Sequence, residues 1–230
     1  MFPNDEDFQQ AMQLVAHENQ TVSLTLTMED ATVTGKPLPP TLPLTVMEPM
    51  KMIHTEVAID YLHDRLISKS DIEYFMLKED TQRQRIAIPT FDRAGNLALL
   101  SGRSYIGANP KYYFYTVDGV PHNNGVLYNE RNVNFDKHVI LVESYFDLYR
   151  VRQALGFDNI VAAINAHLSE RQRQTLATAP HITTLFDSGT AGDNARWQVA
   201  QMGLPCTQLH PPEGQDGGSM SHAEIAQLFT

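Results

Sequence analysis

The 230-residue chain contains a single cysteine, Cys206, and no long apolar run. One cysteine cannot form an internal disulfide, and it excludes a zinc ribbon built from several cysteines of this chain. No stretch approaches the ~18 consecutive apolar residues that a membrane-spanning helix needs. The first residues, MFPNDEDFQQ, are acidic where a secretory signal is basic and then apolar. These absences predict a cytoplasmic protein that does not contact membranes.

Basic residues are also scarce, because 17 Lys and Arg stand against 27 Asp and Glu, for a formal net charge of −10. Attraction to polyphosphate depends on basic groups, so this balance disfavours non-specific binding of nucleic acid by the whole surface. Any such binding requires a local basic groove. The hydrophobic fraction of 42% is sufficient for the core of one large domain or two small ones.

Residues 1–55 are predicted to form a small N-terminal appendage. A helix is expected from Asn4, a residue type that caps helices, and the alternating segment TVSLTLT at 21–27 is typical of a strand. The segment KPLPPTLPL at 36–44 contains too many prolines for either regular element. It is therefore predicted to be a linker or an extended arm.

Residues 56–132 are predicted to form a small α+β unit. Two short amphipathic helices are expected at 54–66 and 70–78. The segment 85–105 contains two apolar runs joined by the glycine-containing turn DRAGN, which predicts a β-hairpin. The aromatic run KYYFYTV at 111–117 is expected to extend the same sheet.

Residues 133–230 show a regular alternation of strand and helix patterns with short loops. Such alternation indicates an α/β domain in which crossover helices connect the strands of a parallel sheet. The expected strands lie at 138–143, 159–164, 182–186 and 206–210, and the expected helices at 144–156, 169–177, 191–203 and 221–229.

Three carboxylates are expected at the carboxyl edge of this sheet, where open α/β sheets bind their ligands. Glu143 ends the first expected strand, Asp187 follows the third, and Asp147 lies four residues after Glu143 in the following helix. Carboxylates gathered without basic partners repel one another, and a hard divalent cation such as Mg²⁺ or Mn²⁺ relieves the repulsion. Alternatively, helix capping and the helix dipole alone favour acidic residues at such positions. The spacing by itself leaves both interpretations open.

The order of these motifs resembles a known family. The run VILVESYFDLYRVRQALGFDNIVAAINAHLSERQRQTL, followed by TTLFDSGTAGDNA, resembles the TOPRIM domain of DnaG-type bacterial and phage DNA primases. Upstream, AIPTFDRAGNLALLSGRSYIGANPKYY resembles the primase subdomain that precedes TOPRIM, and PPEGQDGGSMSHAEIAQLF resembles the stretch that follows its strands. The resemblance extends from about Glu56 to Thr230. It implies a TOPRIM parallel-sheet domain with helices on both faces, preceded by a small α+β subdomain.

The resemblance also implies a function and its residues. Glu143, Asp147 and Asp187 match the carboxylates that hold catalytic Mg²⁺ or Mn²⁺ during RNA primer synthesis on single-stranded DNA. Arg103 matches the arginine of a Gly-Arg motif and Lys111 the lysine of a Pro-Lys-Tyr motif, which contact template or incoming nucleotide. The implied enzyme is a nucleotidyltransferase, a DNA-directed RNA polymerase of the primase type, that acts in DNA replication.

Four departures from the family pattern fall around this site. Gly189 stands where a second aspartate is expected, and Ser144 replaces a glycine. The segment INA, centred on Asn165, replaces a strand-end glycine turn, and Asn123 stands where a basic residue is common. These changes leave open whether catalysis survives. Loss of catalysis and a specialised lineage with rearranged metal ligands both explain them.

Two alternatives to an active primase follow. One is a catalytically degenerate TOPRIM protein that acts as a DNA-binding or replication accessory, and the other is a TOPRIM nuclease. Because neither the zinc ribbon nor the helicase-interaction region of many primases is recognised in the sequence, we expect a minimal or split version of the primase core. A phage or mobile-element origin is also expected. Its expected partners are single-stranded DNA, NTPs, and a replicative helicase or a separate zinc-ribbon protein.

Overall fold

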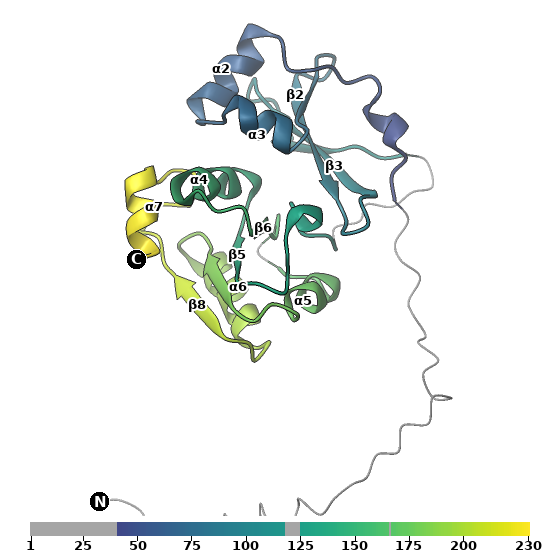
Figure 1. Ribbon diagram of the computed structural model, residues 1–230. Helices are drawn as coiled ribbons and strands as arrows, with labels where there is room; N and C mark the ends of the chain where they lie inside the picture. Colours follow the sequence, from purple (N-terminus) through teal and green to yellow (C-terminus); the bar gives the residue numbers. More distant parts are fainter. Residues whose placement is uncertain (1–40, 118–124, 166) are drawn as a thin grey trace, which may run out of the picture. The chain divides into compact units, whose positions relative to one another are not determined.

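The computed structural model describes residues 41–117, 125–165 and 167–230, which belong to one compact unit (Figure 1). The helix predicted from Asn4 and the strand predicted at 21–27 lie outside the described residues. So does Asn123, one of the departures from the family pattern. In the described ranges, no helix is both long and apolar enough to cross a membrane.

The first half of the described chain forms a four-stranded antiparallel sheet. Its strands are β1 (Lys78–Asp80), β2 (Arg85–Phe91), β3 (Leu97–Ser104) and β4 (Tyr112–Phe114), in the order β1-β2-β3-β4. The predicted hairpin is formed by β2 and β3, and the predicted third aromatic run contributes β4, which pairs Tyr112 with Arg103.

Local residue chemistry sets the turns of this sheet. Between β2 and β3, the Asp92 side chain accepts a hydrogen bond from the Asn96 backbone at 2.9 Å, and Gly95 adopts a φ of 84° that suits glycine. The helix predicted at 70–78 ends earlier, at Tyr74, because Met76 takes a left-handed conformation with φ 56° and the chain then extends into β1. The sequence pattern missed this short strand.

Two capped helices and one short 3-10 helix accompany the antiparallel sheet. Helix α2 (Glu56–Asp64) starts at Thr55, and α3 (Lys69–Tyr74) starts at Ser68, each of which accepts a backbone hydrogen bond at the helix start. The 3-10 helix η1 (Leu44–Met47) precedes them, and its neighbourhood packs on the sheet through a cluster of buried residues: Leu42, Met47, Met50, Ala87, Phe91, Leu97, Leu100 and Tyr115. The domain boundaries at 55/56 and 132/133 stay predictions.

The second half forms the predicted parallel sheet. Its strands are β5 (Val139–Val142), β6 (Ile160–Ala162), β7 (Ile182–Leu185) and β8 (Cys206–Leu209), in the order β6-β5-β7-β8. The helices are α4 (Tyr145–Leu155), α5 (Glu170–Leu176), α6 (Thr190–Ala200) and α7 (His222–Leu228), and the 3-10 helix η2 (Glu130–Asn132) precedes β5. Strands and helices alternate along the chain as expected.

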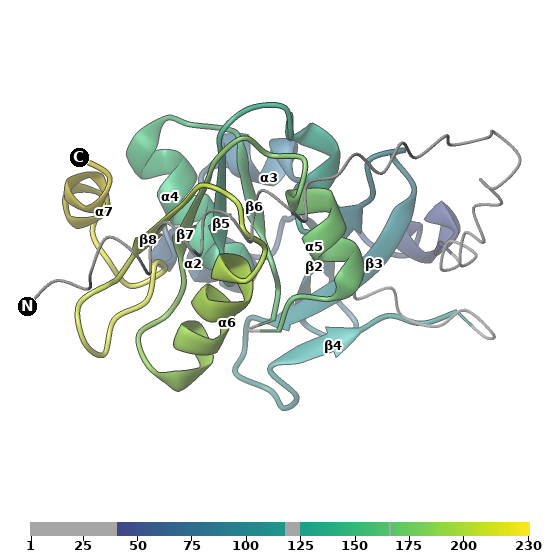
Figure 2. The ribbon, with the colours of Figure 1, turned by 90° about the horizontal axis from the view of Figure 1, so that it is seen from below.

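Helices cover both faces of the parallel sheet, which confirms the predicted fold class. On β5, Ile140 and Val142 face one buried cluster together with residues of α4 and α7, whereas Val139 and Leu141 face another with residues of α5 and α6. This alternation follows from the period of two along a strand. Figures 1 and 2 show α4 on one side of the sheet, and α5 and α6 on the other.

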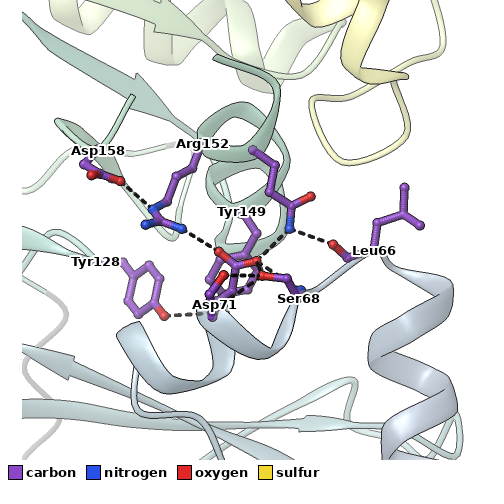
Figure 3. A network of polar contacts seen from close by, with 9 residues as sticks. Leu66, Ser68, Asp71, Tyr128, Tyr149, Arg152 and Asp158 are labelled. Carbon is purple, nitrogen blue, oxygen red and sulfur yellow. Dashed lines mark hydrogen bonds and ion pairs between the residues drawn. The ribbon is translucent and has the colours of Figure 1, made fainter. Parts of the chain in front are cut away.

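A network of polar contacts joins α3 to α4 (Figure 3). The fully buried carboxylate of Asp71 accepts hydrogen bonds from Arg152 Nη1 at 2.7 Å, from Gln153 Nε2 at 2.7 Å and from the Ser68 backbone at 3.0 Å. The guanidinium of Arg152 also lies over the Tyr74 ring at 4.5 Å. A buried carboxylate is stable only when it is paired and hydrogen-bonded, so this network fixes α4 relative to α3.

Candidate metal-binding site

The candidate site lies at the carboxyl edge of the parallel sheet. Strands β5 and β7 are paired in parallel with Val142 opposite Leu185, so the residues that follow them are neighbours. Glu143 follows β5 directly, and Asp187 follows β7 after Phe186. The Asp187 backbone N–H donates to Glu143 Oε2 at 3.4 Å. The two strand-end carboxylates named by the sequence therefore come together.

Asp147 is the third predicted carboxylate, and α4 holds it at its first turn. Ser144 and Asp147 form a capping box, in which the Ser144 backbone N–H donates to Asp147 Oδ2 at 2.8 Å and the Asp147 N–H donates to Ser144 Oγ at 3.4 Å. Asp147 is only 3% exposed. Burial raises the pKa of Asp147 to about 6 with help from nearby negative charges, while the bonds from Ser144 act to lower it. Ser144, a departure from the family glycine, thus caps the helix.

The carboxyl group of Asp187 lies close to several other negative charges. Burial is the largest cause that raises the pKa of Asp187 to about 7. The charges of three neighbouring carboxylates, Asp147, Glu143 and Asp216, raise this pKa further, and the charge of Arg196 acts to lower it. The pKa of Glu143 is also raised, chiefly by burial. A bound cation would relieve this repulsion between the carboxylates.

Asp216 is a fourth member of this group that the sequence analysis did not name as a site residue. It lies in the loop between β8 and α7, and its charge raises the pKa of Glu143, Asp147 and Asp187. A Cβ added to Gly218 would lie 3.1 Å from Asp147 Oδ1 and 3.4 Å from Asp216 Oδ1. The glycines after Asp216 therefore let this loop approach Asp147 closely. Asp216 could have been identified from the sequence as an acidic residue in the loop after the fourth expected strand.

The positions of the carboxylates limit how many side chains can bind one cation. Within the part of the chain that the structure describes, no three His, Cys, Asp or Glu side chains are close enough together to hold one ion. One oxygen of Asp147 is occupied by the capping box. Mg²⁺ usually keeps several waters and takes one or two carboxylates. Glu143 and Asp187, which share the sheet edge, are the residues best placed to hold such an ion, with Asp147 and Asp216 supplying further negative charge.

Residues 137–210 match the family model of the Toprim domain. This part of the chain is a Toprim domain. A DNA primase of Pseudomonas aeruginosa is 30% identical over 163 residues, which cover 65% of this chain and 24% of that protein. The chain thus spans about a quarter of the length of the curated relatives it matches.

Solved structures with the same fold extend the similarity beyond the Toprim domain. A DnaG primase catalytic domain bound to ssDNA has a TM-score of 0.65 at 17% identity, over 80% of this chain and 77% of that one. The primase fragment of the bacteriophage T7 primase-helicase protein has a TM-score of 0.61 at 17% identity, over 84% and 83%. The described residues therefore have the fold of a DnaG-type primase core, and the resemblance seen in the sequence is confirmed.

Arg196 brings a positive charge to the carboxylates of the Toprim domain, and no pattern in the sequence singles it out. It is buried on α6, and its guanidinium donates to the Phe186 carbonyl at 3.0 Å and to the Asp187 carbonyl at 3.3 Å. It also pairs with Asp193 at 2.6 Å. The Asp193 side chain is thus exposed and paired with an arginine.

Two departures of the Toprim domain from its family pattern lie at residues with a positive φ. Gly189 caps α6 with φ 109° and ψ −179°, a conformation that is essentially restricted to glycine. Ile164, in the segment that replaces a glycine turn, has φ 68°, which is strained for a β-branched residue. Ala166, at the end of that segment, lies outside the described residues. Position 189 therefore combines the absence of the expected acid with a backbone conformation that requires glycine.

The two predicted phosphate-binding residues lie in different surroundings. Arg103, on β3, is 8% exposed, and its Nε donates to the Tyr61 hydroxyl at 2.8 Å. Its guanidinium lies over Phe146, the residue before Asp147. Lys111 is exposed next to β4. Arg103 therefore lies beside the α4 end of the carboxylate group, and the roles of both residues stay predictions.

Proposed function

We propose that this chain is the core of a DNA primase that synthesises RNA primers on single-stranded DNA during replication. The observation that carries the proposal is the group of mutually repelling carboxylates at the carboxyl edge of a Toprim sheet, formed by Glu143, Asp147, Asp187 and Asp216. The relatives named DNA primase support it. As the chain spans a quarter of their length, their activity is carried to it as a proposal.

The proposed roles follow from the placement of each group. Glu143 and Asp187 hold Mg²⁺ or Mn²⁺ at the sheet edge, and Arg196 limits the repulsion between them. The bound ion would neutralise the negative charge on the phosphates of the incoming nucleotide. Arg103 and Lys111 bind phosphates of template or nucleotide, the arginine as a bidentate fork and the lysine as a point charge.

The proposed partners are single-stranded DNA, NTPs, and a replicative helicase or a zinc-ribbon protein. One structural neighbour was solved bound to ssDNA, and another is part of a primase-helicase protein. A further neighbour, from Aquifex aeolicus, contains zinc binding and RNA polymerase domains. These features of the neighbours support the proposal for this chain.

A primer-synthesis assay tests the function. The purified protein is incubated with labelled NTPs, single-stranded DNA templates of varied sequence, and Mg²⁺ or Mn²⁺. We expect oligoribonucleotide products that are lost in Glu143→Gln and kept in Asp136→Asn, whose carboxylate is exposed on a loop outside the site. The proposal fails if the wild-type protein gives no product with any template and either metal.

The second candidate function is a degenerate Toprim accessory protein, which the glycine at position 189 favours because it removes one acid from the metal motif. This candidate predicts no measurable Mn²⁺ binding by calorimetry. A clear Mn²⁺ titration that disappears in Asp187→Asn rules it out. A nicking assay on supercoiled DNA tests the third alternative, a Toprim nuclease.

A further inference from the structure

The side-chain hydroxyl of Ser188 joins two loops of the Toprim domain. Ser188 follows Asp187 in the loop between β7 and α6, and its partners lie in the loop between β8 and α7. The Gly214 backbone N–H donates to Ser188 Oγ at 3.1 Å, and the same hydroxyl donates to the Gln215 carbonyl at 3.2 Å. A serine hydroxyl can donate one hydrogen bond and accept others, so this one makes both kinds of bond to a single loop. The next residue of that loop is Asp216.

The loop between β8 and α7 fixes the carboxylate of Asp216 from within. The Asp216 backbone N–H donates to Ser219 Oγ at 3.0 Å, and the Ser219 N–H donates to Asp216 Oδ1 at 2.7 Å. Side chains of this kind commonly stabilise turns by bonding to nearby backbone groups. The orientation of the carboxylate is therefore set within the loop, and its distance from the other carboxylates depends on where the loop lies.

Arg150 holds the far end of this loop. It is buried on α4, and its Nη2 donates to the Met220 carbonyl at 2.5 Å, in the residue before the α7 cap Ser221. In the part of the chain that the structure describes, Arg150 Nε and Nη1 have no hydrogen-bond partner. Buried donors without partners lower stability, and proteins retain such features mainly at functional sites. Stability alone therefore does not explain a guanidinium at this position.

Between these two attachments, the loop lies against the carboxylate group. A Cβ added to Gly217 would lie 3.0 Å from Asp147 Cβ, and one added to Gly218 would lie 3.1 Å from Asp147 Oδ1. The loop backbone therefore packs closely on the first turn of α4. This placement brings Asp216 near enough for its charge to act on the other carboxylates of the site.

We propose that Ser188 and Arg150 are positioning residues that hold the loop of residues 214–220 on the carboxylate group. By doing so, they keep the charge of Asp216 beside the proposed metal ion. The inference rests on the metal site of the proposed function. Both residues act through the loop, because the Ser188 hydroxyl is engaged by two loop groups and Arg150 carries a positive charge that would repel a cation.

Mn²⁺ binding without nucleotide or DNA tests the role of Ser188, with the free ion measured by electron paramagnetic resonance. Ser188→Ala removes both bonds to the loop and is expected to weaken Mn²⁺ binding about fivefold, the equivalent of one lost hydrogen bond. Ser188→Thr retains a hydroxyl and is expected to bind Mn²⁺ as the wild type does. Thr178→Val is the matched control, because it removes an exposed hydroxyl that donates to the Thr175 carbonyl at 3.0 Å, outside the site.

The variant Arg150→Met separates positioning from the effect of charge. Removal of a positive charge near the site would by itself tighten the binding of a cation. The proposal predicts the opposite, because the loop loses its attachment to α4, and Mn²⁺ binding should weaken about fivefold. A merely structural role would shift Tm in EDTA and leave Mn²⁺ binding at least as tight as in the wild type. Thermal unfolding and the Mn²⁺ titration are therefore measured on the same protein.

Asp216→Asn shows whether Ser188 acts through Asp216. This variant removes the charge but retains an oxygen that can accept from the Ser219 N–H, and it is expected to weaken Mn²⁺ binding. When Ser188→Ala is added to Asp216→Asn, no further loss is expected, because the charge that Ser188 positions is already gone.

The results distinguish this proposal from the proposed function. Unchanged Mn²⁺ affinity in Ser188→Ala or in Arg150→Met, or a full additional loss when Ser188→Ala is combined with Asp216→Asn, overturns the positioning role and leaves the proposed function standing. A wild-type protein that binds no Mn²⁺ overturns both. If Mn²⁺ binding depends on both residues in a protein that makes no primers, the positioning role stands and the proposed function falls.

Discussion

The guanidinium of Arg152, on α4, donates through Nη1 to the fully buried carboxylate of Asp71, on α3, at 2.7 Å. The sequence separation is 81 residues, so the contact joins two parts of the chain that are distant in sequence. Helix α4 begins with the turn that carries Asp147. The pair therefore fixes the helix of a site carboxylate against the antiparallel part of the structure, and its loss should be costly.

The substitution Arg152→Leu removes the positive partner and leaves Asp71 buried with only Gln153 and Ser68 as donors. Breaking a buried pair by deleting one member costs about 3–5 kcal/mol. We expect the free energy of unfolding to fall by about 3 kcal/mol, because the remaining hydrogen bonds compensate in part. Urea denaturation followed by circular dichroism measures the change.

The control is Arg173→Leu, which removes an equally short ion pair at the surface. Arg173 contacts Glu170 at 2.7 Å, and the Glu170 side chain is 68% exposed. Exposed pairs contribute about 0–1 kcal/mol, so this variant should unfold almost as the wild type does. Equal losses in the two variants would show that the Asp71 contact has no special role.

The metal-free protein should become more stable as the pH falls through neutrality. The pKa of Asp187 is raised to about 7 and that of Asp147 to about 6, so the folded protein retains protons that the unfolded chain has released. In EDTA, the free energy of unfolding should therefore rise between about pH 8 and pH 5. Asp187→Asn should flatten the upper part of this curve. Added Mg²⁺ should raise Tm more at pH 8 than at pH 6, because it competes with protons; an opposite order would contradict a cation site here.

The positions of Glu143, Asp147 and Asp187 could be predicted because each depends on local pattern. The end of an apolar run in the sequence marks the end of a buried strand, and a residue four positions later lies on the first turn of the next helix. The order β6-β5-β7-β8, which makes β5 and β7 neighbours, was not available from these patterns. The resemblance to primases implied that the three carboxylates act together at one site, but it was not used to predict the strand order.

Three features were not predicted because they depend on packing between segments that are distant in the sequence. They are the positions of Asp216 and Arg196 and the contacts of Phe146. Asp216 reaches the site through a loop whose path is set by the close contact of Gly218 with Asp147. Arg196 looks in the sequence like any charged helix residue, and only its burial against the Asp187 carbonyl reveals its role. Long side chains such as those of arginines can reach many partners, so their contacts are not specified by spacing.

Replacing Gly192 with alanine should not give the increase in stability that this change usually gives in a helix. In an exposed helix this change stabilises by about 1 kcal/mol. Here, a Cβ on Gly192 would lie 2.0 Å from the carbonyl oxygen of Asp187, so the helix must shift away from the site. We expect Gly192→Ala to lower the free energy of unfolding by about 1–3 kcal/mol. Thermal and urea unfolding measure it, and a gain in stability would refute the close approach.

Restoring the missing acid with Gly189→Asp should have two separable effects. The φ of 109° at this position is unfavourable for any side chain, although a Cβ there would meet no atom within 4 Å. This region of backbone conformation is essentially restricted to glycine and costs other residues about 1–3 kcal/mol, so Gly189→Asp and Gly189→Ala should lose similar stability in EDTA. If the new carboxylate reaches the ion that Glu143 and Asp187 are proposed to hold, Mn²⁺ should bind more tightly to Gly189→Asp than to the wild type, and Gly189→Ala should show no such gain. Calorimetric titration of the three proteins compares them, and equal Mn²⁺ affinity in Gly189→Asp and Gly189→Ala would place position 189 outside the metal site.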